Sequence, residues 1–261
     1  MLTLERPDGT LVYEVAGSGP PLFLVTGLGG SRHYWSNLLP TLTARFTVVT
    51  HDHMGTGDTL SRRSHHTVEA LAADVVALMD HLGLAKAHLV GHSTGAAVGQ
   101  IIGAEAPLRL GALVLYAGWA GPDPHFDLCF KVRKALLLAA GPDAYHRATP
   151  LFLYPPSWIG ADQGRLDALI AGMIATSPPA ETMAARVDML LAFDRRRHLG
   201  RIKARTLVLC ADDDQLTPLH LSQEMADAIP GARLARLPWG AHCASQTAPD
   251  AFLEALLPAL A

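Results

Sequence analysis

A serine inside a glycine-flanked pentapeptide is the residue of this chain best suited to nucleophilic chemistry. Residues 91–95 read Gly-His-Ser-Thr-Gly, a G-x-S-x-G pattern with Ser93 at its centre. An apolar run precedes it at residues 87–90, and a run of small residues follows at 96–104. Strand, sharp turn and helix in this order hold a serine out on a strained bend, and the small residues let strand and helix approach closely. The pattern therefore predicts a nucleophilic Ser93.

A serine hydroxyl is inert at neutral pH unless a base takes its proton, and the base needs an orienting carboxylate. Both residue types follow later in the chain. Asp214 comes after the apolar run 206–211, and His242 comes after a second short apolar run, 232–237. The order serine, aspartate, histidine is the one that G-x-S-x-G hydrolases use. We therefore predict that Asp214 orients His242 as the base.

Two neighbouring carboxylates compete for the orienting role. Asp212 and Asp213 immediately precede Asp214. We favour Asp214 because it lies closest to the turn that leads to Pro218, at the end of a strand where side chains point into a site. Asp212 and Asp213 stay open as alternatives.

Negative charge that develops on a substrate oxygen needs fixed donors, which backbone N–H groups on tight turns supply. The N–H of Thr94, directly after the nucleophile, is one candidate. Leu28 is the other, because it lies in the Gly27-Leu28-Gly29-Gly30 loop after an apolar run that ends at Thr26. We predict an oxyanion hole formed by Leu28 and Thr94.

The elements that must position these residues alternate along the chain. Apolar runs typical of buried parallel strands alternate with segments of helical spacing, which predicts an α/β fold with helices on both faces of a mostly parallel sheet. The strand-like runs are 21–26, 46–50, 87–90, 112–117 and 206–211, and the clearest helical spacing is at 68–82.

The strand pattern disappears between residues 118 and 199. This segment contains helical runs at 126–140 and 180–193, and prolines and glycines interrupt it. It is too long for an ordinary loop, so we predict a helical cap of residues 118–199 inserted into a core of 1–117 and 200–261. Aromatic residues of the cap, Trp119 and Tyr154 among them, are expected to roof a substrate pocket.

Composition excludes several function classes. The chain has 261 residues, 49% of them hydrophobic, which suffices for a large core in one α/β domain. Its net charge of −3 does not indicate a basic surface for nucleic acid. No membrane-spanning or secretory segment is evident. We expect a cytoplasmic protein that binds a small molecule; a homodimer is an open alternative to a monomer.

Metal and cofactor motifs are incomplete. His51 and His53 flank an aspartate, but the glycines that follow mark a turn, and no third metal ligand is evident. The loop 27–30 lacks the G-x-G-x-x-G spacing of a dinucleotide site. The three cysteines have no C-x-x-C spacing, which suits a reducing compartment. We therefore expect no cofactor and no metal.

Taken together, the predicted triad and the glycine loop resemble the α/β-hydrolase fold family over essentially the whole chain. A finer resemblance is to the hydrolases of the Rut pathway of pyrimidine (uracil) breakdown, described as aminoacrylate or carbamate hydrolases. The segments that carry this finer resemblance are 27–31, Tyr34-Trp35, 52–57, Gly118-Trp119, 130–133, 151–155, Trp158 and 240–243.

The resemblance implies a small polar substrate and leaves two mechanisms open. With a carbamate, ester or lactone, Ser93 attacks the carbonyl and His242 transfers the proton. With 3-aminoacrylate, His242 acts as acid and base while Ser93 only polarises or positions the substrate. A small anionic substrate would need a cation, and we expect Arg133 of the cap to supply it.

Two other functions remain open from the sequence. A carboxylesterase or enol-lactonase would use the same residues, and a non-catalytic ligand-binding protein would use the same fold. An intact set of Ser93, Asp214 and His242 argues against the non-catalytic alternative.

Overall fold

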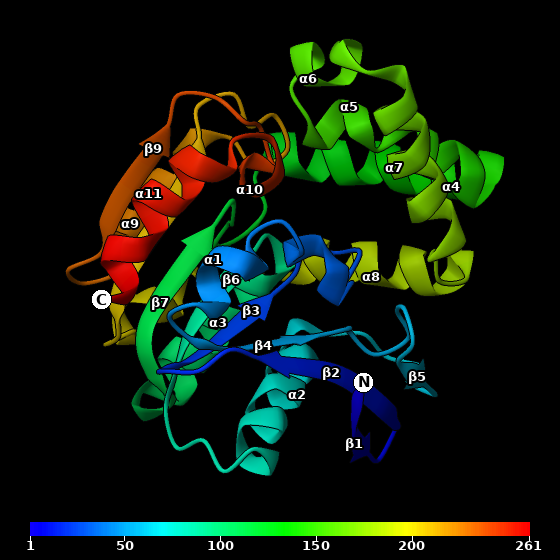
Figure 1. The fold of residues 1–261 in the computed structure, drawn as a ribbon. Coiled ribbons are helices and arrows are strands. Elements are labelled where there is room, and N and C mark those ends of the chain that lie inside the picture. The colour runs from blue at the N-terminus through cyan, green and yellow to red at the C-terminus, as the bar shows by residue number, and fades with distance from the viewer.

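A computed structural model describes residues 1–261 and shows one central sheet flanked by helices (Figure 1). Its strand order is β1-β2-β4-β3-β6-β7-β8-β9, with the short β5 paired to β2. The strands from β4 to β9 along this order are parallel, whereas β1 and β2 are antiparallel to their neighbours. The strand bounds are β1 Leu2–Arg6, β2 Gly9–Ala16, β3 Pro21–Val25, β4 Thr47–His51, β5 Leu60–Ser61, β6 Ala87–His92, β7 Leu110–Tyr116, β8 Arg205–Ala211 and β9 Arg233–Leu237.

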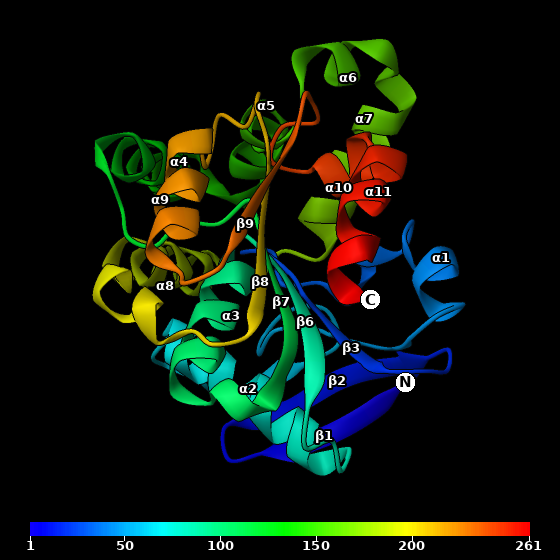
Figure 2. The same cartoon turned by 90° about the vertical axis from the view of Figure 1, so that its left-hand side faces the viewer.

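Helices cover both faces of the sheet (Figure 2). One face packs against α2 (Val68–His81), α3 (Thr94–Glu105) and α9 (Leu219–Ala228), and the other packs against α1 (Leu39–Thr43) and α11 (Pro249–Leu260). Strand β3 shows why both faces are apolar, since Phe23 and Val25 enter the first core and Leu22 and Leu24 the second. The mostly parallel α/β architecture predicted from the sequence is confirmed.

Residues 118–199, which we call the cap segment, contain helices and no strand, as the sequence predicts. These helices are α4 Pro124–Ala148, α5 Pro150–Leu153, α6 Pro156–Ala161, α7 Gln163–Ala175 and α8 Ala180–Ala192. Helix α4 continues past the predicted end of its run, with a kink at Gly141, whose φ of 83° a side chain would rarely adopt. The helices α4 to α7 gather on one side of the sheet (Figure 1).

Shorter elements complete the chain. They are the 3₁₀ turns Arg32–Trp35, Pro107–Arg109 and Arg196–Arg201, and helix α10, Ala244–Thr247. None of the helices has both the length and the apolar character that crossing a bilayer requires.

Candidate active site

Ser93 lies on the turn between β6 and α3 in a strained conformation. Its φ of 53° and ψ of −111° lie outside the regions that non-glycine residues ordinarily occupy. The glycines of the pentapeptide make the turn sterically possible. A Cβ on Gly91 would lie 2.1 Å from the carbonyl oxygen of Gly95, and a Cβ on Gly95 would lie 2.0 Å from that of Val25. The sequence pattern thus has a direct steric basis.

His242 and Asp214 are hydrogen-bonded to each other deep in the protein. His242 Nδ1 lies 2.9 Å from Asp214 Oδ2, and both side chains are almost completely buried. The other carboxylate oxygen, Oδ1, accepts the backbone N–H groups of Leu216 and Thr217, at 2.8 and 3.0 Å. With Nδ1–H donating to the carboxylate, Nε2 is the ring nitrogen left to accept a proton.

The two competing aspartates have other partners. Asp212 pairs with Arg236 near the surface, with Arg236 Nε 2.8 Å from Oδ1. Asp213 accepts the backbone N–H of Ala241 at 2.8 Å. Asp214 is therefore the carboxylate that contacts His242 in the structure.

Thr217 joins the Asp214–His242 pair, and the sequence analysis did not single it out. Its Oγ1 lies 2.8 Å from Asp214 Oδ2, 3.1 Å from His242 Nδ1 and 3.0 Å from the carbonyl oxygen of Ala117. The sequence does contain a signal for this residue, because Thr217 follows Asp214 by three residues after a strand. A turn of this length brings the hydroxyl back to the carboxylate.

Two side chains hold the backbone of His242 through hydrogen bonds to its carbonyl oxygen. Tyr116 Oη and His92 Nε2 both donate to its carbonyl oxygen, at 2.8 and 3.0 Å. Burial lowers the pKa of His92 well below its ordinary value, so the ring is neutral. The ring of Tyr34 stacks on His92, with centroids 4.5 Å apart. None of these contacts is visible in the sequence motif itself.

The glycine loop after β3 lies beside the nucleophile. A Cβ on Gly27 would lie 3.2 Å from the Cβ of Ser93, so this backbone comes close to the serine. Leu28 lines the same cavity as Ser93, and its N–H makes no hydrogen bond within the protein. Thr94 is the first residue of α3, where backbone N–H groups lack intrahelical acceptors.

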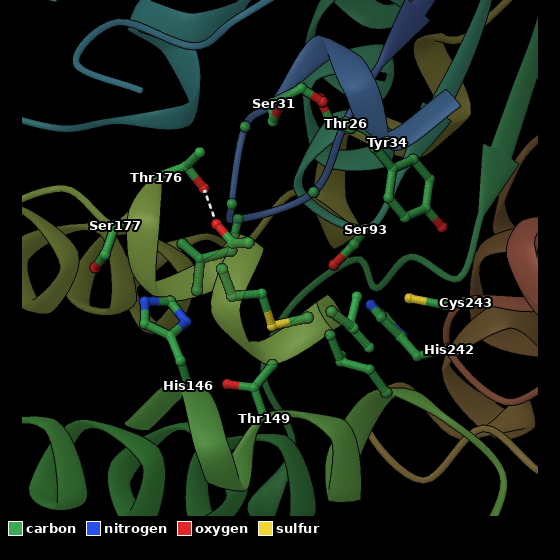
Figure 3. A pocket seen from close by; sticks show the side chains of 18 of the residues that line it. Thr26, Ser31, Tyr34, Ser93, His146, Thr149, Thr176, Ser177, His242 and Cys243 are labelled. Carbon is green, nitrogen blue, oxygen red and sulfur yellow. Dashed lines mark hydrogen bonds between the residues drawn. The ribbon is translucent and has the colours of Figure 1, made fainter. Parts of the chain in front are cut away.

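A cavity of about 430 Å³ separates these loops from the cap segment. Ser93 and His242 line its core side together with Leu28 and Tyr34. Figure 3 shows Ser93, His242 and Cys243 on one side of the pocket, with His146 of α4 and Thr149, which follows that helix, across from them. Ser93 Oγ and the His242 ring thus border one space, although no hydrogen bond joins them. Such bonds are often long before substrate binds.

Cys243 follows His242 in the chain and also lines the cavity. Burial raises the pKa of its thiol to about 12, so the sulfur stays protonated at neutral pH. A protonated thiol is a poor nucleophile.

The three cap residues expected at the pocket occupy different environments. Tyr154 lines the cavity, stacks on Trp158 and donates from Oη to Gln246 Oε1 at 2.7 Å. Arg133 lines the cavity as well. Trp119 does not. Its fully buried ring packs against Phe126 and Phe193 in the main core, so its expected place in the pocket is corrected.

Relatives with known names match nearly the whole chain. A protein of Azorhizobium caulinodans named "Putative carbamate hydrolase RutD" is 41% identical over 96% of this chain and 94% of its own length. The chain belongs to the α/β-hydrolase family. The family model described as alpha/beta hydrolase fold matches this hydrolase over residues 20–146.

Two further comparisons agree with this assignment. A Caulobacter vibrioides protein of the same name is 42% identical to the α/β hydrolase described here, over 98% of this chain and 97% of its own length. The crystal structure of a hydrolase from Pseudomonas aeruginosa superimposes with a TM-score of 0.90 at 30% identity, and the match covers 99% of this chain and 97% of that one.

Proposed function

We propose that this α/β hydrolase uses Ser93, His242 and Asp214 to hydrolyse carbamate or 3-aminoacrylate in the degradation of pyrimidines. The names of the relatives support carbamate as a substrate. The observation that carries the proposal is the buried 2.9 Å contact between His242 Nδ1 and Asp214 Oδ2, on a ring that shares a cavity with the strained Ser93. The three cysteines are free thiols, which suits a cytoplasmic location.

With carbamate, Ser93 Oγ attacks the carbonyl carbon while His242 Nε2 accepts the hydroxyl proton. The N–H groups of Leu28 and Thr94 stabilise the negative charge that develops on the carbonyl oxygen. His242 then returns the proton to the leaving nitrogen, and ammonia departs. Water, deprotonated by His242, attacks the carbonyl of the Ser93-bound group and releases bicarbonate and the free serine.

With 3-aminoacrylate no acyl group has to move to the serine. His242 assists protonation of the enamine carbon and then the addition of water to the resulting imine. Loss of ammonia gives malonic semialdehyde. In this pathway Ser93 positions the substrate or the water.

The decisive experiment measures malonic semialdehyde formation from freshly generated 3-aminoacrylate, and ammonia release from carbamate. Wild-type protein, Ser93→Ala protein and a no-protein blank are compared, because both substrates decompose without an enzyme. We expect the wild type to accelerate at least one reaction and Ser93→Ala to lower an acyl-transfer rate by about 10⁴-fold or more. Ser64→Ala, which changes an exposed serine, is the matched control.

Labelling by a fluorophosphonate probe tests the nucleophile separately. We expect the probe to label the wild type and not the Ser93→Ala protein. A wild type that neither turns over these substrates nor takes the probe would favour the ligand-binding alternative. Labelling without turnover of either substrate would favour esters and enol-lactones as substrates.

A further inference from the structure

Arg133 is a buried cation without an anionic partner. It belongs to α4, is 6% exposed and lines the cavity that Ser93 and His242 also line. The neighbouring lysines of the same helix are paired, Lys131 with Asp127 and Lys134 with Asp188. Arg133 makes no ion pair or hydrogen bond, and its Nε is buried without a partner. A buried charge is ordinarily paired, so this one has the character of a ligand-binding group.

Aromatic rings hold the guanidinium in place. Its carbon lies 5.4 Å from the ring centre of Phe130, 5.0 Å from that of Tyr145 and 5.4 Å from that of Phe152. Ring faces attract a cation but accept no strong hydrogen bond from its N–H groups. The planar fork of donors therefore stays available for an oxyanion, which it can bind through two parallel bonds.

Further unpaired polar atoms lie on the same wall. Tyr145 Oη and both ring nitrogens of His146 are buried without hydrogen-bond partners, and both residues line the cavity with Arg133. Burial, together with the charge of Arg133, lowers the pKa of His146, so its neutral ring carries one N–H donor. Buried polar atoms are nearly always hydrogen-bonded in folded proteins. Their gathering on one wall indicates that a ligand supplies the missing acceptors.

The cavity that this polar wall shares with Ser93 and His242 also has apolar lining residues. His146 lies across the pocket from Ser93 and His242 (Figure 3). The apolar residues of the lining include Leu28, Leu153, Met173 and Met183. A carbamate ion has four non-hydrogen atoms, whereas a cavity of about 430 Å³ falls in the range of pockets that bury drug-sized ligands, roughly 300–1,000 Å³. Such a small ion at Ser93 would leave the cap wall unoccupied.

We propose that the site also hydrolyses half-esters of dicarboxylic acids, whose free carboxylate binds Arg133, Tyr145 and His146. This inference rests on the proposed function, because it uses the same nucleophile. Ser93 Oγ attacks the ester carbonyl, and the alcohol leaves with the proton that His242 took from the serine. Water then adds to the acyl-serine and gives a proton to His242, which passes it to Ser93 Oγ as the dicarboxylic acid is released. The apolar lining residues of the cavity, such as Met173 and Met183, accommodate the methylene chain.

The test compares pairs of esters that differ only in the distal group. Monomethyl esters of succinic, glutaric, adipic and pimelic acid are each paired with the methyl ester of the monocarboxylic acid with the same number of carbons. We expect kcat/KM to be about 10- to 100-fold higher for the half-ester in the best pair, as for a charge-assisted hydrogen bond. Arg133→Gln should lower this ratio of kcat/KM values to about one, and Lys134→Gln should leave it at the wild-type value.

The ratio of the two kcat/KM values within each variant distinguishes a loss of carboxylate recognition from a folding defect. A general defect of the cap lowers turnover of both esters and cancels in the ratio, whereas loss of the carboxylate contact lowers only the half-ester. Tyr145→Phe keeps the cation and removes one donor, so we expect it to reduce the ratio about threefold. Equal kcat/KM for both members of every pair in the wild type overturns the inference while leaving Ser93 as the nucleophile.

If no ester is turned over, binding to the Ser93→Ala protein tests whether the cavity recognises the distal carboxylate. Calorimetry with monomethyl adipate and methyl hexanoate measures recognition without chemistry. Tighter binding of the half-ester that disappears in the Ser93→Ala, Arg133→Gln double variant supports the carboxylate site, even where the proposed hydrolysis fails. Equal affinities in both proteins overturn it.

Discussion

Two parts of the site differ in how far their polar atoms are hydrogen-bonded. They are the core wall, which we define as His242 with Asp214 and Thr217 behind it, and the cap wall, which consists of Arg133, Tyr145 and His146. On the core wall, Asp214 accepts hydrogen bonds from two backbone N–H groups and from Thr217, and it holds His242. On the cap wall, the polar atoms of Tyr145 and His146 and the Nε of Arg133 are buried and have no partner. Both groups of residues are buried, so the difference does not come from exposure to solvent.

The difference separates two tasks. Groups that move protons must be fixed before substrate arrives, because reorganisation during the reaction raises the barrier. Groups that recognise a substrate must keep free donors, since a donor already used within the protein gains little from a ligand. Under the proposed function, the core wall would be preorganised for chemistry, and the cap wall would keep hydrogen-bonding capacity for the ligand.

The largest effect is expected for the carboxylate of the core wall. Asp214→Asn turns an amide toward His242 Nδ1 and favours the wrong tautomer, so kcat should fall by about 10⁴-fold, as in the serine-protease template. Asp212→Asn changes a carboxylate two residues away that pairs with Arg236, and kcat should stay within about twofold. Steady-state kinetics on the best substrate measures both. A larger loss for Asp212→Asn would reverse the assignment.

Two tyrosine hydroxyls, that of Tyr116 beneath His242 and that of Tyr145 on the cap wall, differ in their hydrogen bonding, and removing each one tests this difference. Tyr116 Oη donates to the His242 carbonyl and accepts the N–H of Ser245 at 3.0 Å, so Tyr116→Phe should lower the free energy of unfolding by about 2 kcal/mol. Tyr145→Phe removes a hydroxyl that has no partner, and the free energy should stay the same or rise by up to about 1 kcal/mol. Urea unfolding of the three proteins checks this, and equal losses would contradict the contrast.

The smallest effect concerns the acid stability of the cap wall. The pKa of His146 is lowered in the folded protein, so below about pH 6.5 the unfolded chain binds more protons at this residue than the folded chain does. Stability therefore falls as the pH drops below that value, by at most about 1.4 kcal/mol per unit for this group. Above it, the contribution is constant.

His146→Phe should make this acid-side slope shallower, because the residue no longer titrates. The free energy of unfolding is measured in urea at pH 7 and pH 5 for the wild type, His146→Phe and His65→Phe. His65 is exposed, so its variant should keep the wild-type slope. A slope unchanged by His146→Phe would show that this ring titrates alike in both states.

Local geometry explains what was predictable at the core wall. The glycines around Ser93 have a steric reason that acts within a few residues, and strand ends place Asp214 and His242 at the same edge of a parallel sheet. Thr217 was missed, although its spacing from Asp214 is also local. The support of His242 by Tyr116 and His92 depends on side chains that three separate segments bring together.

The sequence by itself determined the α/β architecture and the sharp turn at Ser93, because these follow from periodicity and backbone sterics over short distances. Only the tertiary structure decided the cap wall. Trp119 and Arg133 are each compatible with a pocket, a core or a surface, and packing against distant residues sent Trp119 to the core and Arg133 to the cavity. A buried arginine indicates ligand binding only when it has no partner within the protein, and only the folded chain shows whether such a partner is absent.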